Sequence, residues 1–268
     1  MHYENIHLLN YSNILTRIRS NTLRTGVIFL CWLMFAFNAM ADELRIAVAS
    51  NFQQAAQELA DQFSQKHGHT LVLLSGSTGK HYAQIRNGLP VDVLLAADSV
   101  RPKRLEEEGR AVMGTRQTYA LGALVLWSAD VEAVDSEGHV LRNLPAGTFL
   151  AIANPKLAPY GLAAQHVLQK MNLWAVYSDR IVMGENIGQA FHFVQSGAAL
   201  LGLVARSQMM QVKPERAGSS WLVPQGLYEP IAQQAVILRD SPAARAWMAY
   251  LNSSEAHEII ERYGYDVP

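Results

Sequence analysis

Four short polar clusters each precede a segment with helical spacing, and together they could bind an anion. The clusters are Ser50-Asn51, Ser77-Thr78-Gly79, Tyr160-Gly161 and Asn186-Ile187-Gly188. The first N–H groups of a helix lack backbone partners and carry partial positive charge, so several helix starts that converge can hold an oxyanion without Lys or Arg. This pattern indicates binding rather than catalysis.

Each cluster also has a purely structural interpretation. Ser50-Asn51 and Ser77-Thr78 could be ordinary N-caps, because Ser, Thr and Asn are favoured at helix starts. Tyr160 could be an aromatic residue at the edge of the core, and Asn186-Ile187-Gly188 an ordinary turn. The binding interpretation therefore depends on all four clusters facing the same cleft.

The clusters lie within an alternation of strand and helix patterns. Such alternation predicts an α/β protein with mostly parallel sheets, which bind ligands at the carboxyl ends of their strands. Strands are expected at residues 44–50, 70–74, 92–97, 119–127, 148–153, 200–205 and 231–238. Helices are expected at 52–67, 78–87, 102–108, 161–171, 188–195, 242–251 and 254–263.

Two long strand patterns, 119–127 and 231–238, flank the second half of this alternation. If each crosses between two lobes, the chain forms a two-lobed protein in which each lobe is a mostly parallel sheet flanked by helices. The ligand cleft then lies between the lobes. We expect lobe I to comprise residues 42–122 and 229–268, and lobe II to comprise residues 123–228.

Residues 1–41 have the layout of a secretory signal peptide. Three arginines precede an apolar run at 26–37, and Ala39-Met40-Ala41 places small residues before a cleavage site after Ala41. The run is shorter than the ~20 residues that a membrane span needs, which disfavours a single membrane anchor. We therefore expect an exported protein.

Composition excludes several other classes of protein and site. Cys31 is the only cysteine and lies within the apolar run, so the exported chain has no disulfide and no Cys-based metal site. Cleavage removes three Arg and one Glu from 22 basic and 23 acidic side chains, which leaves a net charge of −3. A slightly acidic protein is not expected to bind nucleic acid or an anionic membrane. The chain has no His-Glu-x-x-His or Gly-x-Ser-x-Gly motif, which disfavours zinc proteases and many hydrolases.

Short motifs dispersed along residues 47–265 carry a further signal. They are Ala47-Val48-Ala49-Ser50-Asn51-Phe52, Ser75-Gly76-Ser77-Thr78-Gly79-Lys80, Gly88-Leu89-Pro90, Ala97-Asp98, Leu124-Val125-Leu126-Trp127-Ser128, Asn154-Pro155, Ala158-Pro159-Tyr160-Gly161, Gly184-Glu185-Asn186-Ile187-Gly188-Gln189-Ala190, Leu201-Gly202-Leu203-Val204, Tyr228-Glu229-Pro230-Ile231 and Arg262-Tyr263-Gly264-Tyr265. In this order they resemble the periplasmic molybdate-binding proteins of ABC transporters, which are type II periplasmic solute-binding proteins. The resemblance covers nearly all of residues 42–268.

The resemblance implies oxyanion contacts at Ser50, Asn51, Thr78, Tyr160 and Ile187. Ser50 and Thr78 would donate hydroxyl groups, Asn51 its amide, Tyr160 its backbone N–H or its hydroxyl, and Ile187 its backbone N–H alone. No catalytic residue and no directly bonded metal are implied, because molybdenum would arrive as its oxyanion. Some members of the family have Tyr where this chain has Ala205, so the number of side-chain donors differs within the family.

The family resemblance also implies a function and partners. The protein would bind molybdate, and tungstate as well, and deliver it as a monomer to the permease and ATPase of an ABC transporter, without a cofactor. One alternative is a binding protein for sulfate or another tetrahedral oxyanion, which differs only in pocket size. A second alternative is an exported hydrolase with Ser50 or Thr78 as nucleophile, for which Glu185 is the only acid or base within the four clusters.

Overall fold

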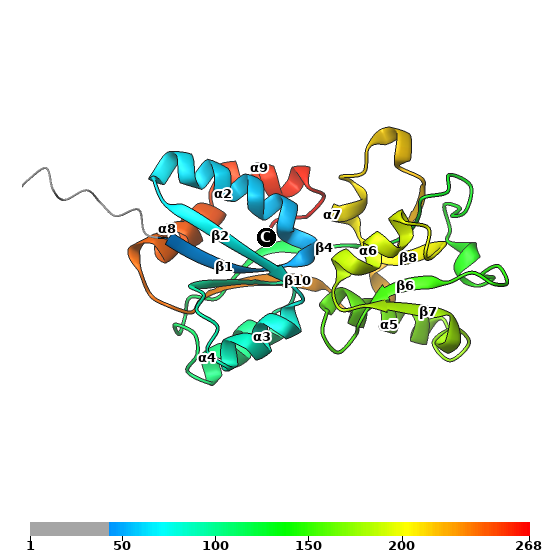
Figure 1. The fold of residues 1–268 in the computed structure, drawn as a ribbon, viewed down its shortest axis with the longest axis horizontal. Helices are drawn as coiled ribbons and strands as arrows, with labels where there is room; N and C mark the ends of the chain where they lie inside the picture. The colour runs from blue at the N-terminus through cyan, green and yellow to red at the C-terminus, as the bar shows by residue number, and fades with distance from the viewer. Residues whose placement is uncertain (1–42) are drawn as a thin grey trace, which may run out of the picture. The chain divides into compact units, whose positions relative to one another are not determined.

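Two five-stranded sheets organise residues 43–268, the part of the chain that the computed structural model describes (Figure 1). The expected signal peptide at residues 1–41 lies outside these residues. The first sheet has the order β2 (Thr70–Gly76), β1 (Glu43–Ala49), β3 (Val93–Ala96), β10 (Ile231–Ile237), β4 (Gln117–Gly122). The second has the order β7 (Ile181–Gly184), β6 (Leu150–Ala153), β8 (Leu201–Ala205), β5 (Leu124–Ser128), β9 (Ser219–Leu222).

The two sheets have the same pattern of strand directions. In the first sheet β10 is antiparallel to both of its neighbours, while β1 is parallel to β2 and β3. In the second sheet β5 is the antiparallel strand, while β6 is parallel to β7 and β8. This arrangement confirms the expected fold of two lobes with mostly parallel sheets, and we call the lobes built on the first and second sheets lobe I and lobe II.

Helices cover both faces of each sheet. Those of lobe I are α2 (Gln53–His67), α3 (Thr78–Arg86), α4 (Val100–Glu107), α8 (Pro242–Leu251) and α9 (Ser254–Arg262), with the short 3-10 helix η1 (Ser50–Phe52) leading into α2. Those of lobe II are α5 (Pro159–Lys170), α6 (Ile187–Gln195) and α7 (Arg206–Met209), with the 3-10 helices η2 (His139–Leu141), η3 (Ser178–Arg180), η4 (Pro214–Arg216) and η5 (Gln225–Leu227).

Alternation along the strands explains why both faces are covered. On β1, Leu44, Ile46 and Val48 are buried in the core under α2, α8 and α9, whereas Ala47 points to the opposite face, under α3 and α4. Figure 1 shows these two helix layers on either side of the sheet. Because both sides of a strand in such a sheet are buried, the strand has a continuous apolar sequence rather than an alternating one.

The structure corrects the expected strand at residues 119–127. This segment forms two strands in different sheets, β4 and β5, which are separated by Ala123. The chain therefore crosses between the lobes here. The apolar pattern continues through the crossing because β5 and the β4 residues Tyr119, Ala120 and Gly122 are buried, so hydrophobicity alone does not show the break.

The second crossing precedes the expected strand at residues 231–238 rather than running along it. All of β10 belongs to the first sheet, and the chain returns from β9 through residues 223–230. The two crossings are neighbours, since Val125 pairs with Leu222 in the second sheet and Gly122 pairs with Ile231 in the first. Strands β7 and β9 were not expected from the sequence.

No helix among residues 43–268 is long and apolar enough to span a membrane.

A substitution of Phe63 tests how much the packing of α2 on the first sheet contributes to stability. Its ring is fully buried and contacts Trp247 and Tyr250 of α8. Phe63→Ala should lower the free energy of unfolding by about 3–5 kcal/mol, since it removes a large buried ring and leaves a cavity. Urea denaturation of residues 42–268 measures this change.

Met113→Ala is the matched control, because Met113 is 71% exposed. It should change the free energy of unfolding by less than about 0.5 kcal/mol. Equal effects of the two substitutions would contradict the described packing of α2.

Candidate functional site

The five residues implied as oxyanion contacts lie around one small cavity between the lobes. Ser50, Asn51 and Thr78 come from lobe I, and Tyr160 and Ile187 come from lobe II. The rest of the lining is Ala49, Gly76, Ser77, Ala97, Ala158 and Pro159. The cavity volume is about 10 Å³, which is room for about one water molecule. No Lys, Arg, His, Asp or Glu is among these lining residues.

Two larger hollows adjoin this cavity. One, of about 340 Å³, shares Ser50 and Asn51 with it and is lined mainly by glutamine side chains and His192. The other, of about 440 Å³, shares Ala97 and Pro159 with it. The central cavity is thus the constricted part of a wider gap between the lobes.

Helix starts surround the cavity. The Ser77 hydroxyl accepts a hydrogen bond from the Lys80 N–H at 3.3 Å and caps α3, and the Asn186 side chain accepts one from the Gln189 N–H at 3.0 Å and caps α6. The residues that follow these caps, Thr78 and Ile187, are the first of their helices. The structural and the binding interpretations therefore apply to neighbouring residues: Ser77 and Asn186 are caps, and Thr78 and Ile187 line the cavity.

The hydroxyl groups of Ser50 and Thr78 can each act as a donor. Ser50 Oγ accepts a hydrogen bond from the Gly188 N–H at 3.3 Å, and Thr78 Oγ1 accepts one from the Ala97 N–H at 3.0 Å. A hydroxyl that accepts such a bond still has its own proton to donate. Both residues can therefore present an O–H to a molecule in the cavity.

The side chain of Asn51 is used differently from what the resemblance implies. Its Nδ2 donates to Gln233 Oε1 at 2.8 Å and to the Tyr265 hydroxyl at 3.0 Å, and these two bonds use both amide protons. Its backbone oxygen accepts from the hydroxyls of Tyr265 and Ser207. The backbone N–H of Asn51, in the first turn of η1, is the donor that remains for the cavity.

Tyr160 contributes to the cavity at the start of α5 rather than through its hydroxyl. The hydroxyl lies 3.5 Å from Gln233 Nε2 and directly beside Gly122, and neither of these residues lines the cavity. Burial, and then the neighbouring tyrosines, raises the pKa of Tyr160 well above its ordinary value. The side chain therefore stays neutral, and the backbone N–H in the first turn of α5 is the group available to a ligand.

Several polar contacts hold the two lobes together around the cavity. The closest backbone contact is the hydrogen bond from the Gly79 N–H to the Leu157 oxygen at 2.8 Å. A Cβ at Gly79 would lie 2.7 Å from that oxygen, so only glycine allows this approach. The others include Gly188 N–H to Ser50 Oγ, Ser207 Oγ to the Asn51 oxygen, Arg101 Nη2 to the Lys156 oxygen, Gln233 Nε2 to the Tyr160 hydroxyl, and the ion pair Lys80–Glu185.

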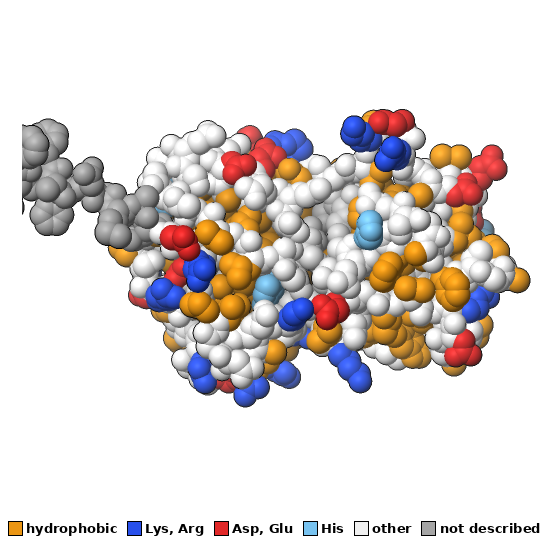
Figure 2. All heavy atoms as spheres, viewed as in Figure 1, with side chains coloured by type: hydrophobic (Ala, Val, Ile, Leu, Met, Phe, Trp, Pro, Cys, Tyr) orange, Lys and Arg blue, Asp and Glu red, His pale blue; other side chains and the backbone are white. Residues whose placement is uncertain are grey.

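An exposed ion pair connects the two lobes beside the cavity. Lys80 Nζ is 3.0 Å from Glu185 Oε2, and about half of each side chain is exposed. Figure 2 shows that the surface along the junction of the lobes is mostly uncharged on the side facing the viewer. Because such an exposed pair contributes roughly 0–1 kcal/mol, it is a minor part of lobe closure.

His81 lies beneath the cavity and is only 3% exposed. Its Nε2 lies 3.2 Å from the Val48 oxygen, and its Nδ1 is buried without a hydrogen-bond partner. Burial lowers the pKa of His81 below its ordinary value, although the bond to Val48 acts in the opposite direction. A neutral imidazole that donates through Nε2 fits these contacts.

Among residues 43–268, no group of three or more His, Cys, Asp or Glu side chains is arranged to hold a metal ion.

The sequence did not identify the polar residues behind the cavity. Gln233 of β10 is fully buried and bonds to Asn51, Tyr119 and Tyr160. The feature of the sequence that could have indicated Gln233 is the pair of glutamines, Gln233 and Gln234, in an otherwise apolar strand. Only the fold shows that the first of them meets residues far away in the sequence.

The chain is similar over its described length to known solute-binding proteins. A family model for bacterial extracellular solute-binding proteins matches residues 44–266. The molybdate-binding protein ModA of Azotobacter vinelandii is 47% identical over 235 residues, which cover 87% of this chain and 93% of that protein. ModA of Rhodobacter capsulatus is 45% identical over 248 residues, which cover 91% of this chain and 96% of that protein.

A solved structure agrees with these sequence matches. The periplasmic molybdate-binding protein of Azotobacter vinelandii matches with a TM-score of 0.80 and 42% identity, and the match covers 84% of this chain and 99% of that chain. The matched part, 84% of this chain, is longer than either lobe, so the similarity extends over both lobes.

The lowered pKa of His81 predicts how stability depends on pH. Because the unfolded chain binds a proton near pH 6.5 and the folded protein only at lower pH, the free energy of unfolding falls as the pH drops below 6.5. His81→Gln keeps an N–H donor for the Val48 oxygen and removes the titration. Urea midpoints of the variant should therefore fall less than those of the unsubstituted protein between about pH 7.5 and about pH 5.5.

His166→Gln, which removes one half-buried imidazole on α5, is the matched control. If His81→Gln loses as much stability on acidification as the unsubstituted protein, His81 is not the group responsible.

Proposed function

Because the chain belongs to the bacterial extracellular solute-binding protein family and to its molybdate-binding ModA group, we propose that it binds molybdate outside the cytoplasm and delivers it to an ABC transporter for import. Tungstate, which has the same charge and shape, is proposed as a second ligand. The observation that carries this proposal is a cavity without ionisable groups other than Tyr160, which is lined by donors from both lobes.

The proposed contacts are all neutral donors. They are the hydroxyls of Ser50 and Thr78 and the backbone N–H groups of Asn51, Tyr160 and Ile187. Hydrogen bonds to a charged group contribute about 1.5–3 kcal/mol each, so this number of contacts is sufficient for tight binding after ordering costs. Three helix starts add the favourable field of their dipoles.

A cavity of donors selects for a fully deprotonated oxyanion. Partly protonated phosphate carries an O–H that would face another donor and leave both groups without an acceptor. Sulfate has no such proton, so its exclusion depends on cavity size. In the closed form the cavity has room for about one water molecule. We therefore infer that the ligand enters while the lobes are apart, and that the cavity walls close around it at a wider separation.

Closure would follow from contacts that the ligand makes with both lobes. A ligand shifts an open–closed equilibrium only by its differential affinity for the two states. We assign residues 42–122 and 229–268 to lobe I and residues 123–228 to lobe II, since Ala123 and residues 223–230 carry the two chain crossings. These neighbouring crossings would be the hinge.

We further propose that residues 1–41 are a signal peptide cleaved after Ala41, and that the exported chain works in the periplasm as a monomer. Its partners would be the permease and the ATPase of the transporter. The hydrolase alternative is not favoured, because Glu185 pairs with Lys80 outside the cavity lining and no Lys, Arg, His, Asp or Glu lies among the cavity-lining residues.

Isothermal titration of residues 42–268 with molybdate, tungstate, sulfate and phosphate at matched ionic strength tests the proposed function. We expect one-to-one binding of molybdate and tungstate, and little heat from sulfate or phosphate. Sulfate binding as tight as molybdate binding would identify a sulfate-binding protein instead. Absence of binding by all four anions would refute the oxyanion proposal.

Removal of the two hydroxyl donors tests the site residues. Ser50→Ala and Thr78→Ala should each weaken molybdate binding by about 10-fold to 150-fold, which is the equivalent of one hydrogen bond to a charged group. Titration of each variant measures the change.

Glu185→Gln is the control, because it keeps the size of the side chain and removes only the exposed ion pair with Lys80. It should change affinity less than about fivefold. A loss as large as that of the hydroxyl variants would point to a direct role of Glu185, as the enzyme alternative requires.

A further inference from the structure

The pairing between β4 and β10 contains an irregularity next to the site. Gln233 pairs with Ala120 and Gln234 with Thr118, so β4 has one extra residue, Tyr119, at this point. Such a bulge bends a strand and changes the direction of a side chain, and bulges are frequent beside functional sites. Here the bulge lies opposite two consecutive glutamines of β10 that have different partners.

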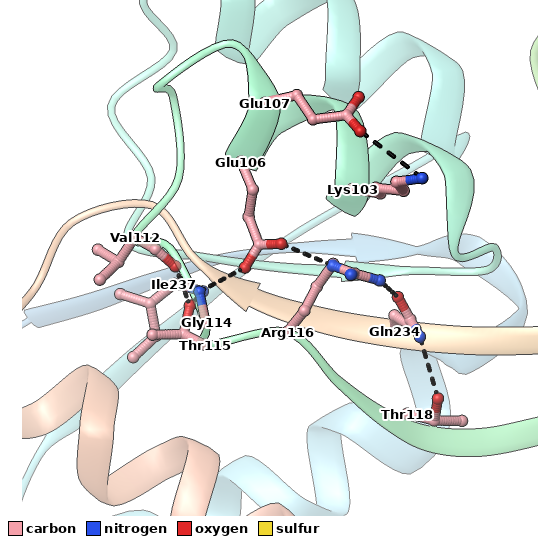
Figure 3. A network of polar contacts seen from close by, with 10 residues as sticks. All are labelled: Lys103, Glu106, Glu107, Val112, Gly114, Thr115, Arg116, Thr118, Gln234 and Ile237. Atoms are coloured by element: carbon pink, nitrogen blue, oxygen red, sulfur yellow. Dashed lines mark hydrogen bonds and ion pairs between the residues drawn. The ribbon is translucent and has the colours of Figure 1, made fainter.

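Gln234, which follows the bulge, is tied to the outer part of lobe I. Its Oε1 accepts from Arg116 Nη1 at 2.8 Å and its Nε2 donates to Thr118 Oγ1 at 3.1 Å (Figure 3). Arg116 in turn pairs with the buried carboxylate of Glu106 at 2.7 Å. Burial raises the pKa of Glu106, but the bonds from Arg116 and Gly114 outweigh it and lower the pKa overall. The bulge is therefore held in a fixed position by a charged network.

Gln233, which precedes the bulge, points inward and connects the lobes. Its Oε1 accepts from Asn51 Nδ2 at 2.8 Å and from the Tyr119 hydroxyl at 3.2 Å, both in lobe I. Its Nε2 reaches the hydroxyl of Tyr160, in lobe II, at 3.5 Å. One fully buried side chain thus contacts two residues that line the cavity from opposite lobes.

The hydroxyl of Tyr160 fits against Gly122 at the end of β4, one residue before the crossing at Ala123. A Cβ added at Gly122 would lie 2.1 Å from the Tyr160 hydroxyl oxygen and 2.9 Å from Gln233 Nε2. The φ angle of Gly122 is not in the left-handed region, so an alanine there would be excluded by space alone. Glycine is required because the Tyr160 side chain occupies the position of the missing Cβ.

The ring of Tyr160 has little freedom to avoid such a clash. The residue is 1% exposed and packs within the core of lobe II. Its backbone is held in the first turn of α5. The clash between an added Cβ at Gly122 and the Tyr160 hydroxyl is therefore relieved most simply when lobe II moves away from lobe I. This movement opens the cavity.

We propose that Gly122 and Gln233 are positioning residues that couple occupation of the cavity to closure of the lobes. In the closed form the Tyr160 hydroxyl lies against Gly122, and Gln233 fixes Asn51 at the same time. When the lobes separate, Tyr160 leaves this position and Gln233 loses its contact with lobe II. The inference rests on the proposed function, because the ligand whose binding closes the lobes is taken to be molybdate.

Gly122→Ala tests this coupling. The folded lobes should form as in the unsubstituted protein, since the three atoms nearest to the added methyl group belong to the side chains of Tyr160 and Gln233. Molybdate affinity should fall at least about tenfold, measured by titration, because closure is now strained. The decrease in radius of gyration on molybdate addition, measured by small-angle X-ray scattering, should be reduced or lost.

The second substitution Tyr160→Phe distinguishes this coupling from a general packing defect. In the Gly122→Ala background it removes the atom at 2.1 Å and leaves Tyr160 Cζ at 3.0 Å as the nearest ring atom. The double variant should regain part of the affinity and of the compaction that Gly122→Ala loses. A double-mutant cycle that includes Tyr160→Phe alone gives the coupling between the two positions.

Val131→Ala is the control, because Val131 of lobe II is 73% exposed and lies outside both the cavity lining and the two crossings. It should bind molybdate and compact as the unsubstituted protein does. If the unsubstituted protein binds and compacts while Gly122→Ala does both equally well, or if the losses of Gly122→Ala and Tyr160→Phe are additive, the coupling is refuted and the function stands. If the unsubstituted protein binds no molybdate, the proposed function itself fails, and the coupling proposal fails with it.

Discussion

An anion that is held without a cationic side chain must have its charge balanced by oriented dipoles. In the proposed site these dipoles are the N–H groups at the starts of α3, α5 and α6, together with η1. Each belongs to a different strand–helix connection, and two come from each lobe. The charge balance therefore exists only when the two sheets face each other at close range, so the fold and the site depend on the same geometry.

The mixed sheets make this geometry available. In each sheet the parallel strands end at the same edge and lead into the helices that start there, which places their first turns side by side. The antiparallel strands β5 and β10 are the first strands after the two crossings between the lobes. They bring both crossings together at Ala123 and residues 223–230. Because these residues lie outside the strands, the chain can bend there without breaking the pairing in either sheet.

Two kinds of contact between the lobes differ in how they depend on distance. Lys80–Glu185 at the rim is exposed and screened by water and salt, so it contributes little. Gly79 with Leu157 and Gly122 with Tyr160 are close approaches that depend on the absence of a side chain. Steric fit of this second kind changes steeply with distance, which makes it suitable for defining a closed state.

The sequence by itself determined most of the strands and helices, the presence of two α/β units and the four polar clusters at helix starts, and the family resemblance narrowed these clusters to Ser50, Asn51, Thr78, Tyr160 and Ile187 as candidate contacts. Local patterns suffice for the elements and the clusters, because apolar periodicity and helix-start residues act over a few positions. The tertiary structure decided that residues 119–127 are two strands in two sheets, that the Asn51 side chain turns away to Gln233 and Tyr265, and that the Tyr160 hydroxyl lies against Gly122. These features depend on which atoms meet across as many as 214 positions of sequence, and no local pattern specifies such distances.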